Sequence, residues 1–179
     1  MERYRRDNGK FCIDVHFHEF SQLYDGRDPS PFHERDLDEN LVHYLVMGCE
    51  EIPHDEPVKI VMTTPHSQIE EQQKNDFILA LHQYFEHEMR LTDNELKYLF
   101  RQGRVSLLFG LSFLILCIFL AVRFVGDTTI FSRVVYEGLL IMGWVALWKP
   151  LNIFLYDWWP YLRKKRVYKQ LSTISIEFN

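Results

Sequence analysis

A long apolar stretch at residues 105–125, VSLLFGLSFLILCIFLAVRFV, constrains the fold of this chain more than any other feature. Its 21 residues, at ~1.5 Å each along a helix, are long enough to cross the ~30 Å hydrocarbon core of a bilayer. A buried core helix of a soluble protein is the alternative interpretation. A second apolar stretch, residues 134–156, follows after a short connector, so the pair predicts a transmembrane helical hairpin.

The second stretch is less purely apolar than the first. It holds Glu137 near its start and Lys149 with Pro150 near its end, and Trp158 and Trp159 follow it. Paired tryptophans at the end of an apolar stretch are typical of a membrane interface, so we expect them to anchor the helix in lipid. A re-entrant or interfacial segment is the alternative.

Charge divides the chain into two unlike parts. Residues 1–96 hold nine Lys or Arg against 21 Asp or Glu, a net charge of −12, whereas residues 97–179 hold 11 against four, a net charge of +7. This split predicts an acidic soluble domain joined to a basic, membrane-seated part. An acidic domain is repelled by nucleic acid and by anionic lipid surfaces. We therefore expect no nucleic-acid partner, while a protein partner of the acidic domain stays open.

Basic residues flank the two apolar stretches on one side only. Lys97, Arg101 and Arg104 precede the first stretch, and the connector holds only Asp127 and Arg133 as charges. Five basic residues follow the second stretch: Arg163, Lys164, Lys165, Arg166 and Lys169. Because positive flanks stay on the cytoplasmic side, both termini are predicted to be cytoplasmic. The polar start carries no cleavable signal peptide, so insertion would rely on the internal spans.

The residues before the first span predict a small α+β domain. Alternation of apolar and polar residues at 11–17 and again at 58–63 predicts two strands. Between them we expect a helix that is capped by Asp36 or Asp38 and runs to about Glu51. A strand, a helix and a strand in this order favour a right-handed crossover with parallel strands.

Later segments complete the predicted domain. A longer helix is expected from Ser67 onward, and Thr92 with Glu95 forms a capping box that predicts a further helix running into the membrane. Residues 174–178 alternate once more, and a lone strand is unstable in water. We therefore expect this tail to rejoin the sheet, either in its own subunit or in a neighbour.

The predicted fold class is an α+β cytoplasmic domain (β-α-β-α plus a C-terminal strand) with a transmembrane helical hairpin. The acidic domain is expected to cover residues 1–96 and the hairpin residues 97–160. Residues 161–179 are expected to form a basic cytoplasmic tail whose strand returns to the N-terminal domain.

Charges within apolar spans are costly and therefore mark candidate sites. Arg123 and Glu137 lie near the outer ends of the two spans, at similar depth in an antiparallel hairpin. The two residues could form an ion or proton path, or a salt bridge that holds the hairpin together. Snorkelling of the arginine to the interface is a further interpretation.

Lys149, with Asn152 nearby, is the best candidate for a functional position within the membrane. It precedes Pro150, which removes one helical hydrogen bond and frees the carbonyl of Ala146. Lys149 could cap that carbonyl, reach Asp157, or face a polar cavity between subunits. A purely structural kink is the alternative.

Eight histidines invite a metal hypothesis. His16 and His18 share one strand face, and His82 and Glu86 share a helical face. Zinc sites, however, usually combine three or four ligands at tight spacing, and no HxxxH, CxxC or HExxH pattern occurs. We therefore expect no metal, no cofactor and no catalytic residue, with a membrane-tethered metal-dependent enzyme as a remote alternative.

The remaining candidates are a loop and three cysteines. The loop at residues 19–37 is rich in turn formers and acid–base groups, which suit a partner-docking or catalytic loop, or a solvated turn before a helix cap. Cys12, Cys49 and Cys117 stand at unrelated spacings, so reduced buried thiols are expected.

Two stretches, SPFHERDLD before the first predicted helix and WKPLNIFLYDWWP at the end of the second span, carry a resemblance. Together they resemble a family of uncharacterised bacterial membrane proteins that join a small cytoplasmic α+β domain to a two-helix hairpin. The resemblance covers most of the chain. It implies a bacterial inner-membrane location and supplies no catalytic residues.

The expected function is that of a non-enzymatic assembly or scaffold protein of the bacterial inner membrane. Two helices alone bury little area in lipid, and Gly110, Gly138 and Gly143 permit close helix approach, so we expect a homo-oligomer. A pore or channel component, lined by Glu137, Lys149 and Asn152 of the second span, is the alternative.

Overall fold

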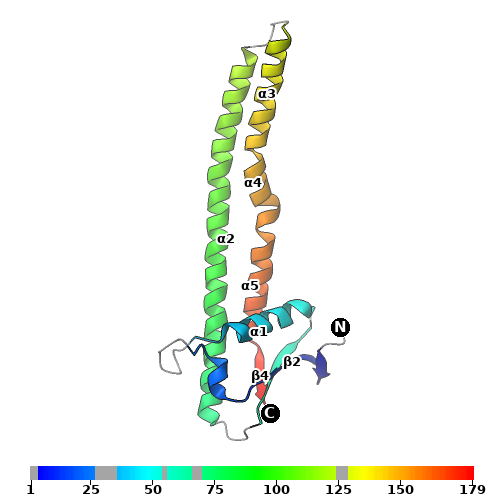
Figure 1. Cartoon of the computed structure of the whole chain (residues 1–179), viewed down its shortest axis with the longest axis vertical. Helices are drawn as coiled ribbons and strands as arrows, with labels where there is room; N and C mark the ends of the chain where they lie inside the picture. Colours follow the sequence, from blue (N-terminus) through cyan, green and yellow to red (C-terminus); the bar gives the residue numbers. More distant parts are fainter. Residues whose placement is uncertain (1–3, 27–35, 54–55, 66–69, 124–128) are drawn as a thin grey trace. The chain divides into compact units, whose positions relative to one another are not determined.

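The computed structural model describes residues 4–26, 36–53, 56–65, 70–123 and 129–179. It is a mixed α+β chain with one four-stranded sheet and long helices (Figure 1). The elements are β1 (Arg5–Asp7), β2 (Lys10–His16), the 3₁₀ helix η1 (Phe20–Leu23), α1 (Glu39–Glu51), β3 (Val58–Thr63), α2 (Glu71–Val122), α3 (Ile130–Ala146), α4 (Trp148–Asn152), the π-helical turn η2 (Ile153–Asp157), α5 (Trp159–Leu171) and β4 (Ser175–Phe178).

The chain divides into two compact units. The first unit combines Met1–Thr92 with Arg163–Asn179, and the second unit is Asp93–Leu162. The first unit therefore takes residues from both ends of the chain, and the second is the segment between them. α2 begins in the first unit and ends in the second.

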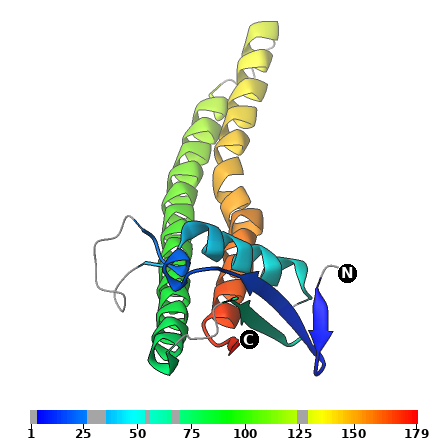
Figure 2. The same cartoon turned by 60° about the horizontal axis from the view of Figure 1, so that its bottom comes forward.

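The sheet of the first unit has the strand order β1-β2-β3-β4 (Figure 2). β2 and β3 are parallel, with Ile13 opposite Ile60, as the strand–helix–strand order predicts. β4 is parallel to β3, with Ile60 opposite Ile176, so the tail does rejoin the sheet, and it does so within its own chain. The backbone amide of Asn179 extends this pairing by donating to the Met62 carbonyl at 2.8 Å.

β1 was missed by the sequence analysis, which treated residues 1–10 as a polar lead-in. It pairs antiparallel with β2 through a two-residue turn at Asn8 and Gly9, whose φ angles are 50° and 77°. Asn-Gly is the preferred pair for such a turn because both positions need positive φ. The dipeptide was therefore the available signal, and the domain begins with a β-hairpin.

The core of the first unit lies between one face of the sheet and three helices. Gly48 of α1 packs so close to β2 that a side-chain carbon placed on it would lie 3.0 Å from Ile13 Cδ1. The fully buried residues at its centre are Ile13, Leu45, Ile60, Met62, Phe77, Leu81, Phe85, Val167 and Leu171. Phe77, Leu81 and Phe85 lie four residues apart along α2 and so share the buried face of this helix.

Helix α1 begins where a capping residue satisfies its first amides. Asp38 Oδ1 accepts hydrogen bonds from the amides of Asn40 at 2.9 Å and Leu41 at 3.0 Å, so Asp38 rather than Asp36 is the cap. Leu41 and Cys49 of α1 are buried, whereas Tyr44 is 42% exposed. The Tyr44 hydroxyl donates a hydrogen bond to the Asp14 carbonyl of β2.

The predicted helix start at Thr92 is wrong. α2 runs without a break from Glu71 to Val122, and the Thr92 hydroxyl donates to the Glu88 carbonyl at 2.9 Å. Threonine caps a helix only at its first turn, whereas in the interior its hydroxyl bonds back one turn, as it does here. The residues that connect the two units therefore belong to one continuous helix.

Strand β3 departs from the predicted alternation, because both of its faces are covered. Lys59 lies on the face away from the helices yet is only 3% exposed. Its ammonium donates to Asp7 Oδ2 at 2.7 Å and to Glu177 Oε2 at 2.6 Å. These bonds raise the pKa of Lys59 and, with the charge of Lys59, hold the pKa of Asp7 below its usual value. One lysine on β3 thus ties β1 and β4 into the sheet.

We predict that Lys59→Met loosens both edges of the sheet, because two carboxylates then face each other without a cation. Amide hydrogen exchange of the full chain in detergent should quicken at residues 175–178 and 5–7. Lys10→Met is the matched control, since Lys10 is an exposed lysine of the neighbouring strand. Unchanged exchange in Lys59→Met, or equal change in Lys10→Met, would contradict this role.

The pH dependence of the same contact follows from the two shifts. Because the pKa of Asp7 is lowered on folding, its contribution is present at neutral pH and is lost as pH falls through the folded pKa. The pKa of Lys59 is raised, so its contribution is lost only as pH rises through that alkaline value. Exchange at β4 should therefore quicken on acidification.

Candidate functional site

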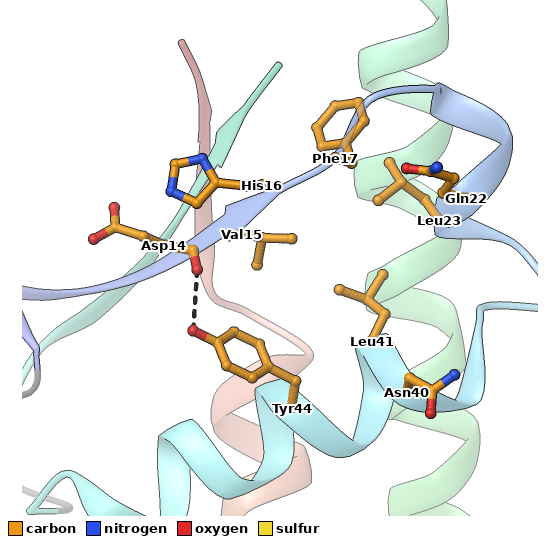
Figure 3. A pocket seen from close by; sticks show the side chains of 9 residues that line it. All are labelled: Asp14, Val15, His16, Phe17, Gln22, Leu23, Asn40, Leu41 and Tyr44. Carbon is orange, nitrogen blue, oxygen red and sulfur yellow. Dashed lines mark hydrogen bonds between the residues drawn. The ribbon is translucent and has the colours of Figure 1, made fainter. Parts of the chain in front are cut away.

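A groove of about 410 Å³ opens on the first unit, at the carboxyl end of β2 and beside the start of α1 (Figure 3). The carboxyl ends of strands in parallel sheets are the usual place for ligands in open α/β folds. Its lining residues are Asp14, Val15, His16, Phe17, Gln22, Leu23, Asn40, Leu41 and Tyr44.

The polar groups of this groove make local hydrogen bonds, one of which joins two lining residues. The Asp14 carboxylate accepts a bond from Arg5 at 3.2 Å, and the Asp14 carbonyl accepts one from the Tyr44 hydroxyl at 3.1 Å. Gln22 Oε1 accepts from the backbone amide of His18 at 3.0 Å. Asp14 and His16 project from one side of β2 and Val15 from the other (Figure 3). Within the described chain the groove therefore assembles no nucleophile with a base.

The long loop at residues 19–37 is closed at its base. The amide of Asp25 donates to the Asp36 carbonyl at 2.8 Å, and the amide of Asp38 donates to the Leu23 carbonyl at 3.1 Å. Burial raises the pKa of Tyr24 to about 12, so its phenol is neutral at physiological pH. Residues 27–35, with most of the acid–base groups and His33, lie outside the described residues.

The histidines of the metal hypothesis lie in different parts of the first unit. His82 Nε2 lies 2.9 Å from the Ile174 carbonyl, where it contacts the start of the C-terminal strand. Glu86, its predicted neighbour on the helix, instead pairs with Arg90 at 2.6 Å. Among the described residues no three His, Cys, Asp or Glu side chains form a group able to hold a metal ion.

The cysteines are free and buried, as predicted. Burial raises the pKa of Cys49 to about 12, so its thiol stays protonated and unreactive at neutral pH. Cys117 belongs to the second unit and lies between its helices, where its Cβ is 3.2 Å from a carbon placed on Gly143.

The second unit pairs the later part of α2 with the helices that follow it. A carbon placed on Gly103 would lie 2.8 Å from Ile153 Cγ2, and one placed on Gly110 would lie 2.9 Å from the Ala146 oxygen. Seven residues forward along α2 therefore match seven residues back along the partner, which makes the pair antiparallel. We call two residues level when this register places them opposite each other.

The second helix of this pair begins and ends at identifiable signals. Thr129 caps α3, since its hydroxyl oxygen accepts the amide of Ser132 at 3.4 Å. After Ala146 the helix is interrupted by Pro150 and then by the π-helical turn η2. Prolines and π-helical turns are the usual places where a long helix bends.

The carbonyl that Pro150 leaves without a backbone donor points at Gly110. The Ala146 oxygen lies 2.9 Å from the place that a side-chain carbon at position 110 would take, so a Cα–H of Gly110 faces it. This contact answers one question from the sequence. Among the described residues Lys149 makes no hydrogen bond to this carbonyl, and its side chain is exposed.

The predicted interface anchors differ from each other. The Trp158 indole N–H donates to the Phe154 carbonyl at 2.9 Å, within the π-helical turn. The Trp158 side chain therefore supplies a hydrogen-bond donor to a backbone carbonyl of this turn. Trp159 is 63% exposed and packs obliquely on Trp158 with ring centroids 5.6 Å apart.

The charged candidates of the two apolar stretches lie near the ends of the pair. Glu137 pairs with Arg133 one turn away at 3.7 Å, and the Arg123 guanidinium lies over the Phe119 ring at 5.5 Å. An Arg123–Glu137 pair is not among the ion pairs of the described residues. By the register, Arg133 is level with Arg123 and Asn152 is level with Arg104.

Two helical stretches, Glu71–Val122 and Ile130–Leu171, are long and apolar enough to cross a membrane. In the most apolar 18-residue window of each, only 17% and 11% of the residues are buried. A core helix of a soluble protein is mostly buried within its own chain, whereas most residues of these two windows are exposed.

Comparison with known proteins found no matching family, curated protein or solved structure. The resemblance to bacterial two-helix membrane proteins therefore stays a prediction from the sequence.

We predict that Gly110→Ala disrupts the helix pair, because the added carbon meets backbone, which cannot rotate away as a side chain can. Tryptophan fluorescence of the full chain in mild detergent should report a lower unfolding temperature. Leu108→Ala is the control on the same helix, since the Leu108 side chain is 67% exposed. Equal unfolding temperatures for the two variants would show that the close approach has no energetic role.

Proposed function

We propose that this chain is an integral protein of the bacterial inner membrane that acts as a non-enzymatic assembly or scaffold protein. The observation that carries the proposal is the exposure of the two apolar helical stretches, of which few residues are buried within the chain. Exposed apolar surface of this extent is stable only in lipid or against another protein.

The apolar parts of the two helices in the second unit have equal lengths, which suits a single membrane thickness. Arg104 and Arg123 bracket the apolar part of α2 over 19 residues, about 28 Å at the usual helical rise. Their level partners Asn152 and Arg133 bracket an equal length of the second helix. Both lengths match a ~30 Å hydrocarbon core. In this placement the second span covers about 133–152 rather than 134–156.

The two charges inside these limits each lie about one turn from a boundary. Glu137 pairs with Arg133 at the outer boundary, and the long side chain of Lys149 reaches the inner one by snorkelling. This interpretation favours structural roles for Arg123, Glu137 and Lys149 over an ion or proton path.

The strand pairing in the first unit supports an even number of membrane crossings. Because β4 pairs with β3 in the same chain, the segment between them leaves and rejoins one soluble domain. A single crossing would separate the two strands by the bilayer. Both termini on the cytoplasmic side, as the basic flanks predict, agree with this topology.

Homo-oligomerisation is part of the proposal. Gly138 has open space where a side chain would be, so its backbone is accessible to a helix of another copy. Gly110 and Gly143, by contrast, are already used within the helix pair. A scaffold built from several copies would display several acidic domains on one membrane face.

A pore component is the second candidate function. Its support is that the second helix is interrupted by Pro150 and η2 beside exposed Lys149 and half-buried Asn152. Irregular backbone at membrane depth is tolerated where it lines a water-filled cavity. Reconstituted bilayers should then conduct, and Lys149→Leu should change the conductance. Bilayers without conductance would remove this candidate.

The topology is tested by labelling single cysteines in a chain that lacks Cys12, Cys49 and Cys117. Ile130→Cys, at an 85% exposed position, should react with a membrane-impermeant maleimide in spheroplasts, whose inner membrane is intact. Ser172→Cys should react only after that membrane is opened. Alkaline extraction should leave both variants in the membrane pellet. Release into the supernatant would refute membrane integration.

The oligomer is tested by the mass of the detergent-purified particle. Native mass spectrometry should give a defined multiple of the 21.6 kDa chain. Gly138→Leu should reduce the multiple by blocking close helix approach, whereas Leu108→Ala, at an exposed position of α2, should not. Monomers alone in several mild detergents would remove the oligomer claim.

A further inference from the structure

Three exposed cations gather at one end of the second unit. Arg101 and Arg104 lie three residues apart on α2, so their side chains are neighbours on the helix surface. The register places Asn152 level with Arg104, and Lys149 lies one turn further along. The three residues therefore lie within about two helical turns of one another along the helix pair, and we call them the basic band.

The basic band lacks compensating carboxylates. Among the described residues, Arg101, Arg104 and Lys149 make no ion pair, whereas Lys97 pairs with Asp93 at 2.7 Å. At the opposite end of the unit Arg133 pairs with Glu137 at 3.7 Å. Arg123, at that same end, makes no ion pair among the described residues and lies over the Phe119 ring, so the basic band is the larger of two groups of uncompensated positive charge.

Exposed aromatic rings surround the same levels. Tyr98, Trp148, Tyr156 and Trp159 are each between 63% and 69% exposed. Aromatic rings of this kind prefer the headgroup level of a bilayer, where one edge is apolar and the other is wet. Apolar residues of α2, such as Val105 and Leu108, are exposed directly beyond the arginines. A ligand of this surface must therefore combine a negative head with an apolar chain.

We propose that the basic band binds the phosphate of an anionic phospholipid from the cytoplasmic leaflet. The arginine guanidinium groups match a phosphate in bidentate geometry, and Lys149 adds a point charge. The acyl chains would lie along the exposed apolar side chains of α2. A zwitterionic lipid carries its own cation and leaves the three charges uncompensated. This inference rests on the proposed membrane integration.

The test is native mass spectrometry of the purified full chain, titrated with phosphatidylglycerol or phosphatidylcholine in detergent. The unaltered chain should retain phosphatidylglycerol in preference to phosphatidylcholine. Replacing Arg101, Arg104 and Lys149 by Gln should weaken that binding about fivefold for each cation removed. Arg123→Gln, at the opposite end, is the matched control and should bind as the unaltered chain does.

Two further arms keep the result interpretable. Arg101→Lys with Arg104→Lys preserves charge and should retain part of the preference, which separates lost charge from misfolding. Glycerol phosphate at millimolar concentration should not displace the lipid; displacement would indicate a soluble phosphate ligand and overturn the proposal.

The failure modes are distinct. Equal retention of both lipids by the unaltered chain, or equal loss in Arg123→Gln, would overturn the lipid site while membrane integration stands. Release of the chain by alkaline extraction would refute the proposed function itself.

Discussion

The pairing of β4 with β3 is the constraint on which the rest of the structure depends. It joins residues 175–178 to a sheet whose other strands lie before residue 64. The segment Asp93–Leu162 between them must therefore leave the first unit and return to it. Lys59 strengthens this closure, because its ammonium binds carboxylates from the first and the last strand at once. An antiparallel helix pair meets this requirement, because its two ends lie at the same side.

Within the second unit the corresponding constraint is the satisfaction of backbone groups without water. Pro150 removes a donor, and the freed Ala146 oxygen is placed against Gly110. A few residues later the Trp158 indole N–H donates a hydrogen bond to the Phe154 carbonyl in the π-helical turn. The irregular helical backbone is therefore stabilised by particular side chains and, at Gly110, by the lack of one. In lipid, where water cannot substitute, these contacts carry more weight than in a soluble helix.

The same register changes the meaning of the charged residues. Taken from the sequence alone, Lys149 and Glu137 are charges inside a long apolar stretch and invite a transport function. The antiparallel match places Asn152 level with Arg104 and Arg133 level with Arg123. Each isolated charge then lies about one turn from a boundary of the apolar segment, where snorkelling or a local ion pair is sufficient.

The sequence by itself determined the local features: the strand at 58–63, a helix capped by Asp36 or Asp38, and the two apolar stretches. Each depends on neighbours along the chain, through alternation, capping and hydrophobic length. The tertiary structure decided what depends on distant residues. Thr92 lies inside a helix because packing continues past it, Lys59 is covered by carboxylates far away in sequence, and Gly110 is needed because Ala146 approaches it. No local pattern encodes these contacts, since their partners are brought together only by the pairing of β4 with β3 and by the antiparallel register of the helices.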